Sequence, residues 1–216
     1  MQAAIKIAVE RDELPEIFNP DEAVRVELYA QNIISSYVSA SPEQRASGAD
    51  WYAAAARLAG VIASVTGITF SQAAAVLAVT SPSVSWANQV KYTLPFVEAV
   101  LAGAAPRSVK GPFYGANKDK AGRILAGDMS ALSGVKVTAF YRNICGNHDE
   151  ATVDRHALRI ALARDLNPEQ CKVLLNPRSR ERVLVVAAYH LAARRLGQSV
   201  AIVQAVTWVV FRGKAD

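Results

Sequence analysis

Residues 131–159, which read ALSGVKVTAFYRNICGNHDEATVDRHALR, decide the fold of this chain more than any other stretch. A tight turn that contains Gly134 separates two segments that favour helix, because glycine adopts backbone conformations that other residues avoid. The polar run 146–149 then favours a loop. Asp154 stands where a further helix begins, since a carboxylate accepts hydrogen bonds from the N–H groups of a first turn. The stretch therefore predicts helix, turn, helix, loop and helix.

Helix signals continue in both directions from this stretch. The pair Asn19-Pro20 is typical of a helix start, with Asn as the cap and Pro at the first helical position. Hydrophobic residues make up 51% of the chain, and its abundant Ala favours helices. We therefore expect an all-α fold. Besides the helices of 131–159, helices are expected over residues 19–38, 51–65, 69–79, 84–101, 117–126, 178–196 and 199–211, and a further helix is expected to begin at residues 167–169.

Three features predict interruptions or irregular structure. Pro42 favours a short helix of its own, and Asp50 is expected to cap a separate helix that begins at Trp51. Pro95 is expected to kink the helix over 84–101 or to end it early, because proline lacks the amide that a helix interior needs. Residues 1–18 are expected to form an N-terminal arm, in which the alternating residues 5–9 are compatible with a short strand or an extended segment.

Length, charge and cysteine usage narrow the class of protein. The 216 residues suit a single domain over 1–216, and the net charge of +5 is compatible with nucleic acid as a partner. Cys145 and Cys171 form no C-x-x-C pair, which argues against a zinc site, an iron–sulfur cluster and a disulfide scaffold. No signal peptide and no membrane span are recognisable, so we expect a cytoplasmic protein, of a bacterium or, if phage-encoded, of its host.

The segments Leu132-Ser133-Gly134-Val135 and Val153-Asp154-Arg155-His156 together resemble the signature of the helix-hairpin-helix DNA glycosylase superfamily, the endonuclease III-like group. In that family a glycine-bearing hairpin binds DNA and an Asp in the second segment is the catalytic carboxylate. The resemblance extends over roughly residues 51–212. It implies a two-lobed helical bundle around a central cleft, with Asp154 as the catalytic residue, in a divergent member of the phage type.

Lys136 is the candidate nucleophile for an additional lyase step. Family members with this activity carry a lysine eighteen positions before the catalytic Asp, and Lys136 lies at that distance from Asp154. In this alignment Gly134 takes the place of the second hairpin glycine, and Leu132 that of the first. In the other alignment Gly134 is the first glycine, Lys136 replaces the second, and the interval to Asp154 is two residues too short. The sequence leaves both alignments open.

The resemblance implies two further sets of residues. The DNA-binding set uses backbone amides and cationic side chains, which hold phosphates without reading sequence. It comprises Gly134, Val135, Lys118, Lys120, Arg142 and Arg155. The base pocket uses hydroxyl, amide and aromatic groups, which contact a nucleotide that has been flipped out of the duplex. It comprises Ser83, Trp86, Asn88, Tyr114 and His156.

The expected cofactors and partners follow from the same resemblance. No metal and no iron–sulfur cluster is expected, and the one candidate ion is a monovalent cation held by carbonyl groups of the hairpin. Double-stranded DNA is the expected partner, and the protein is expected to act as a monomer without a membrane.

The leading functional hypothesis is a DNA-repair enzyme, a base-excision N-glycosylase that flips a damaged or modified base and cleaves its glycosidic bond. Asp154 would stabilise the positive charge that forms on the sugar, and Lys136 would form a Schiff base if the enzyme is also a lyase. Two alternatives remain open. One is a phage DNA-modification enzyme of the same fold that acts on hypermodified pyrimidines, and the other is a DNA-binding module without catalysis.

Overall fold

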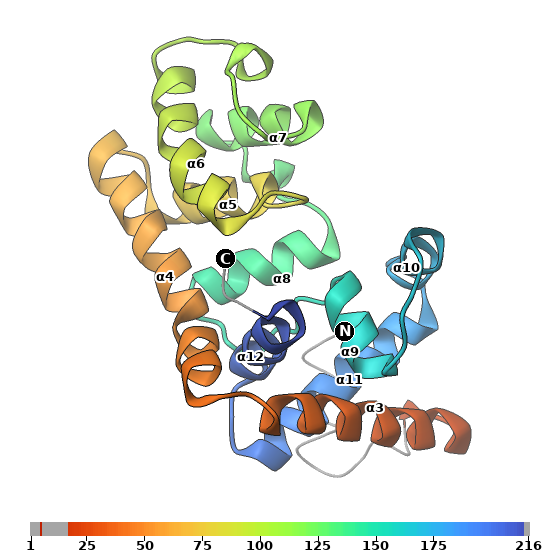
Figure 1. The fold of residues 1–216 in the computed structure, drawn as a ribbon. Helices are drawn as coiled ribbons and strands as arrows, with labels where there is room; N and C mark the ends of the chain where they lie inside the picture. Colours follow the sequence, from red (N-terminus) through yellow and green to blue (C-terminus); the bar gives the residue numbers. More distant parts are fainter. Residues whose placement is uncertain (1–4, 6–16, 214–216) are drawn as a thin grey trace. The chain divides into compact units, whose positions relative to one another are not determined.

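The computed structural model describes residue 5 and residues 17–213. These residues form ten α-helices and two short 3₁₀ helices, with no strand among them, so the all-α prediction is confirmed (Figure 1). The helices are α3 (Pro20–Val38), α4 (Pro42–Thr66), α5 (Phe70–Thr80), α6 (Trp86–Leu101), η1 (Pro106–Ser108), α7 (Gly115–Leu125), η2 (Met129–Ala131), α8 (Val135–Ile144), α9 (Arg155–Leu162), α10 (Pro168–Leu174), α11 (Arg180–Leu196) and α12 (Val200–Arg212).

The described part of the chain divides into two compact units. The first unit contains the described residues up to Trp51 and those from Asn147 onward, and the second is Tyr52–Gly146. The expected N-terminal arm lies outside the described residues, apart from residues 5, 17 and 18. None of the described helices combines the length and the apolar character that crossing a membrane requires. The single domain with lobes around a central cleft stays a prediction.

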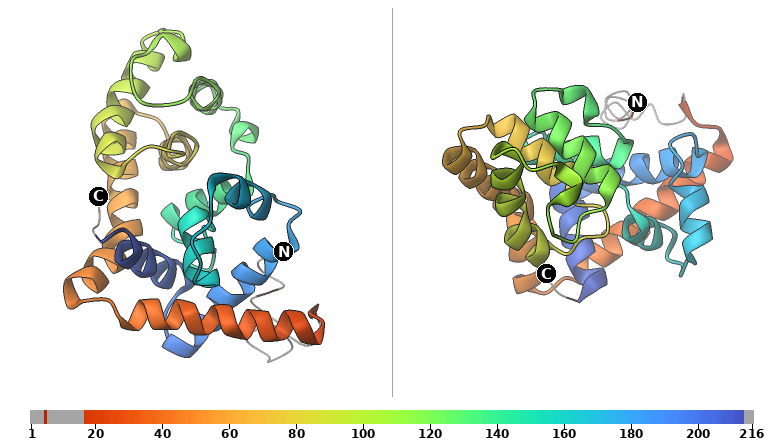
Figure 2. Two further views of the ribbon diagram at one scale, coloured as in Figure 1. Left: turned by 45° about the vertical axis from the view of Figure 1, so that its right-hand side comes forward. Right: turned by 90° about the horizontal axis from the view of Figure 1, so that it is seen from above.

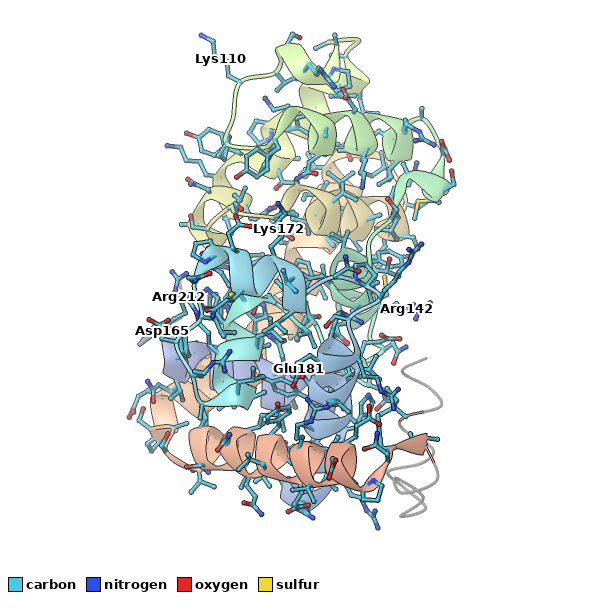
Figure 3. All side chains as sticks on the ribbon, turned by 90° about the vertical axis from the view of Figure 1, so that its right-hand side faces the viewer. Lys110, Arg142, Asp165, Lys172, Glu181 and Arg212 are labelled. Atoms are coloured by element: carbon cyan, nitrogen blue, oxygen red, sulfur yellow. The ribbon has the colours of Figure 1, made fainter. Side chains whose placement is uncertain are left out.

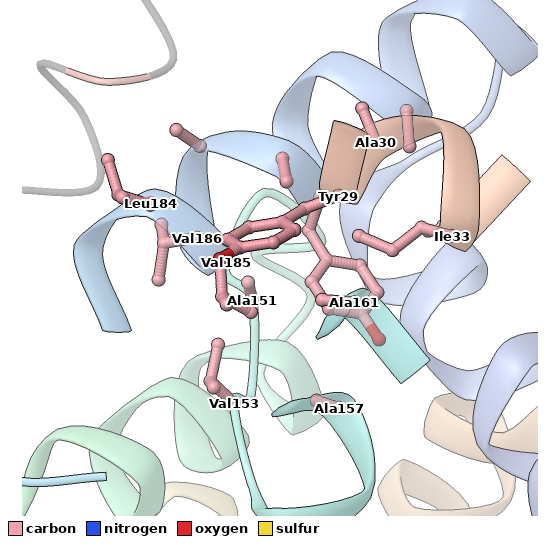
Figure 4. Close-up of a cluster of buried hydrophobic side chains, with 14 of the residues drawn as sticks. Tyr29, Ala30, Ile33, Ala151, Val153, Ala157, Ala161, Leu184, Val185 and Val186 are labelled. Atoms are coloured by element: carbon pink, nitrogen blue, oxygen red, sulfur yellow. The ribbon is translucent and has the colours of Figure 1, made fainter. Parts of the chain in front are cut away.

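Helix α11 is the centre of the first unit. Nearly all of its residues from 182 to 193 are buried, because apolar residues occur on every side of the helix. Helices α3, α9 and α12 pack around it (Figures 1 and 2). Figure 4 shows Tyr29 and Ile33 of α3 within the same cluster as Val185 of α11 and Ala157 of α9.

Polar pairs fix α3 against α11 at the edge of this core. Arg180 donates to both oxygens of Glu22, at 2.6 and 2.7 Å, and these bonds lower the pKa of Glu22 to about 2. The hydroxyl of Tyr29 donates to Glu181 at 2.5 Å. Burial, together with that bond, raises the pKa of Tyr29 to about 12. The directional, charge-assisted bonds set the register of the two helices.

Helix α5 is the centre of the second unit. Its residues 73–80 are buried, and α6, α7 and α8 all pack against it. Thr69 caps its first turn, and the side chain of Gln72 accepts a hydrogen bond from the backbone amide of Thr69. The Gln72 amide also donates to the carbonyl of Ile124 at 3.1 Å, which links α5 to the end of α7.

The expected interruption before Trp51 is wrong, because residues 42–66 form the single continuous helix α4 and Asp50 lies inside it. Gly48 does not break this helix. A Cβ atom on Gly48 would lie 2.5 Å from the Cα of Val206 on α12. The glycine therefore allows the backbones of α4 and α12 to approach closely, and this packing supports the helical conformation that glycine alone disfavours.

One of the two expectations for Pro95 is also wrong, because α6 continues past it to Leu101. The helix begins at Trp86, with Ser85 as its cap. Phe96 and Val97, directly after the proline, are buried. Their packing offsets the backbone hydrogen bond that the proline removes.

Candidate functional site

The turn before α8 brings a glycine to the start of a helix. Gly134 is the N-cap of α8 with φ 99° and ψ 129°, a conformation that residues with a Cβ rarely adopt. No side chain caps α8, and a Cβ on Gly134 would meet no atom within 4 Å. An anion can therefore approach the positive end of α8 from the side of Gly134.

Helix α7 places basic side chains beside this turn. The ammonium group of Lys120 lies 2.9 Å from the hydroxyl of Ser133, the residue before Gly134. Lys118 has a different environment, because its side chain is buried and its ammonium donates to the carbonyl of Val109 at 2.6 Å. The structure thus brings Lys120 to the turn and gives Lys118 a structural contact within the second unit.

The other predicted DNA-binding residues, and the lysine predicted as nucleophile, are divided between the two units. Val135 and Lys136 are half-buried in the first turn of α8, and Arg142 is exposed in its last turn (Figure 3). Arg155 is exposed at the first position of α9, in the first unit. Lys136 and Asp154 accordingly belong to different units.

Asp154 is the N-cap of α9, as the sequence predicted. Its Oδ1 accepts hydrogen bonds from the backbone amides of His156 and Ala157, both at 2.9 Å. The side chain is half-buried. These bonds and the helix dipole hold a carboxylate in a fixed orientation at the positive end of α9.

His156 lies in an aromatic cluster of the first unit. Its ring is 5.3 Å from that of Phe211 and 6.3 Å from that of Trp208, both on α12. Nδ1 is buried and has no hydrogen-bond partner among the described residues. Burial lowers the pKa of His156, and neighbouring arginines lower it further, whereas Asp154 opposes them. The ring is therefore neutral near pH 7 and packs against α12.

The predicted base-pocket residues are divided between the two units. Ser83, Trp86 and Asn88 lie in one segment around the start of α6, and Tyr114 is the exposed N-cap of α7. These four residues belong to the second unit, and His156 belongs to the first. Ser83 is exposed with φ 63°, an unusual conformation for a residue that is not glycine.

A cavity of about 550 Å³ in the first unit was missed by the sequence analysis. One wall is a row of polar residues on α3 and at its end, spaced i, i+3, i+4 and i+7 as on one face of a helix. This spacing is visible in the sequence. The opposite walls come from α9, the residues after it, and α12. The lining residues are Asn32, Ser35, Ser36, Ser39, Arg159, Ile160, Ala163, Arg164, Asp165 and Phe211.

The turn around Gly134 is the place where the resemblance implies a monovalent cation held by backbone carbonyls. The carbonyl of Gly134 accepts the amide of Thr138, and that of Met129 accepts the amide of Leu132. Both carbonyls thus take part in backbone hydrogen bonds of this segment, and the monovalent cation stays a prediction. The described residues also contain no group of three or more His, Cys, Asp or Glu side chains arranged to hold a metal.

The model of a family of unknown function (DUF7178) matches residues 16–215. The chain belongs to this family. No curated protein and no solved structure matches it. The part of the chain that the DUF7178 model matches contains Gly134, Asp154 and every residue that lines the cavity.

Proposed function

We propose that this DUF7178 protein binds double-stranded DNA through the Gly134 turn and releases a flipped base by cleaving its N-glycosidic bond. The observation that carries the proposal is the start of α8, which has no side-chain cap and follows an exposed glycine with positive φ. Such a helix start offers backbone amides and a favourable dipole to a phosphate. Lys120, bonded to Ser133 in the same turn, adds a positive charge there.

Asp154 is the proposed catalytic carboxylate. When the bond between base and sugar breaks, positive charge develops on the sugar, and a fixed carboxylate stabilises it. The two amide bonds from α9 hold the side chain of Asp154 in one orientation. Water then adds to the anomeric carbon, one of its protons is released, and the base leaves with the bonding electron pair.

Lys136 is the proposed nucleophile if the reaction includes strand cleavage. Its amine would add to the anomeric carbon in place of water and form a Schiff base with the opened sugar. This role rests on the interval of eighteen residues between Lys136 and Asp154. Base release does not depend on Lys136, because water is the nucleophile in that step.

The experiment that tests the proposal incubates the protein with duplexes that carry single damaged bases and with phage DNA that contains modified pyrimidines. Mass spectrometry measures free base and abasic sites, and borohydride reduction traps any Schiff base. Free base together with abasic sites is the expected result, and a trapped complex that Lys136→Gln abolishes would assign the lyase step. An altered base without abasic sites would contradict base excision, as would DNA binding without any chemical change.

A further inference from the structure

The cavity in the first unit has one wall that suits an anion. The side chains of Arg159 and Arg164 lie on the α9 side, and the hydroxyl-bearing stripe of α3 lies across from them. Arg159 donates from Nε and Nη2 to the carbonyl of Leu166, which fixes its guanidinium group. Asp165 supplies the single carboxylate of the lining; its side chain is almost fully exposed and forms an ion pair with Nε of Arg159 at 3.4 Å, so the excess positive charge is that of Arg164. The lining therefore has a net positive charge.

The backbone at this wall is in an unusual conformation. Ala163 ends α9 in the left-handed region, with φ 46° and ψ 41°, where glycine is the ordinary residue. Strained backbone of this kind occurs often at ligand sites. Here the left-handed residue directly precedes Arg164 and Asp165, both of which line the cavity.

Another part of the lining is apolar. Phe211 is 45% exposed although it is a large aromatic residue, and Ile160 and Ala163 line the cavity with it. The ring of Phe211 lies 5.3 Å from that of His156. An exposed aromatic face of this kind is a surface on which a nucleobase stacks.

We propose that the cavity is a nucleotide-binding site, in which Arg164 and the serines of α3 hold a phosphate while the base lies on Phe211. A volume of about 550 Å³ is within the range of small-molecule sites. The combination of the exposed Arg164, the hydroxyl groups of α3 and the aromatic surface of Phe211 matches the two parts of a nucleotide, phosphate and base. The nucleotide is either free or part of a DNA strand, and the site does not depend on the proposed base release.

Calorimetric titration tests this site with deoxynucleoside monophosphates, inorganic phosphate and a short single-stranded oligonucleotide as separate probes. Arg164→Gln removes the exposed guanidinium group and is expected to weaken mononucleotide binding about tenfold or more. Phe211→Leu removes the aromatic surface and is expected to weaken it about fivefold or more. Lys172→Gln is the matched control, because this exposed lysine of α10 lies in the same unit but does not line the cavity (Figure 3).

Two results support the proposal. Either mononucleotides bind, or only the oligonucleotide binds, and in each case Arg164→Gln and Phe211→Leu weaken binding while Lys172→Gln leaves it within about twofold. The first result assigns a free nucleotide and the second a DNA strand. The proposal is overturned if neither the mononucleotides nor the oligonucleotide bind at millimolar concentration. It is also overturned if Arg164→Gln and Phe211→Leu bind the nucleotide probe as tightly as Lys172→Gln does. A third contradicting result is that inorganic phosphate binds as tightly as a mononucleotide, because the base would then contribute nothing.

Discussion

His156 has little contact with solvent, and its surroundings oppose a positive charge. The ring packs against two aromatic side chains of α12, and Arg155, Arg159 and Arg212 act on it electrostatically from α9 and α12. Asp154 is the neighbouring group that favours the charged form, and burial outweighs it. The folded state therefore binds a proton at this residue less readily than the unfolded state does.

This difference predicts a pH dependence of stability. His156 has a lowered pKa in the folded state, so its contribution is complete above the unfolded value of about 6.5 and is lost progressively below it. The free energy of unfolding should fall as the pH decreases from about 6.5, by no more than about 1.4 kcal/mol per pH unit from this residue. Urea unfolding at a series of pH values measures this dependence of the free energy of unfolding on pH. His156→Gln should flatten the dependence, and an unchanged slope in that variant would contradict the assignment.

At the scale of the element, Gly48 and Gly60 make a matched pair within α4. A Cβ on Gly48 would clash with the backbone of Val206, whereas a Cβ on Gly60 would meet no atom within 4 Å. Gly48→Ala should destabilise the protein by about 1–3 kcal/mol, because backbone atoms must move to accept it. Gly60→Ala should stabilise it by about 0.5–1 kcal/mol, through helix propensity alone. Denaturant unfolding of both variants checks this, and equal effects would refute the close contact of α4 with α12.

Element boundaries were predictable from sequence where the signal is local. Asn19, Asp154 and Ser199 each cap the helix that follows, and capping depends on groups within one turn. The continuity of α4 was not predicted, and the sequence left open whether α6 ends at Pro95 or continues past it, because packing against distant residues decides both. The cavity was missed for the same reason, since its walls come from three helices that are far apart in the sequence.

At the scale of the whole molecule, the surroundings of some predicted site residues follow from the local sequence and those of others do not. The sequence identified the glycine turn and the Asp154 cap, because both are local backbone features. It assigned Lys118 to DNA, whereas the structure gives its ammonium a carbonyl partner inside the second unit. The burial of a charged side chain depends on tertiary contacts, and a single sequence does not show which residues those contacts bring together.

DNA binding through the Gly134 turn predicts a specific dependence on salt. The logarithm of the binding constant for duplex DNA should fall linearly with the logarithm of the salt concentration, because binding to the phosphates releases counterions. Lys120→Gln should weaken binding across all sequences and reduce the slope by about 1, since one phosphate contact is lost. Fluorescence anisotropy of a labelled duplex measures both quantities. Lys172→Gln is the control, and a slope that responds equally to both variants would argue against the turn as the contact.

The role of Asp154 combines a structural task with the proposed chemical one, and substitutions separate them. Asparagine and serine both serve well as N-caps, so Asp154→Asn and Asp154→Ser should keep the free energy of unfolding within about 0.5 kcal/mol of the unmodified chain. Neither supplies a carboxylate, so neither should stabilise positive charge on a sugar.

Base release by Asp154→Asn, measured beside the unmodified protein on the same duplex, is therefore the most direct measurement. Unfolding measurements first show that the variant is folded, and anisotropy shows that it still binds DNA. We then predict that the rate of base release falls by about a hundredfold or more. Base release at the full rate by the folded variant would show that Asp154 is only the cap of α9.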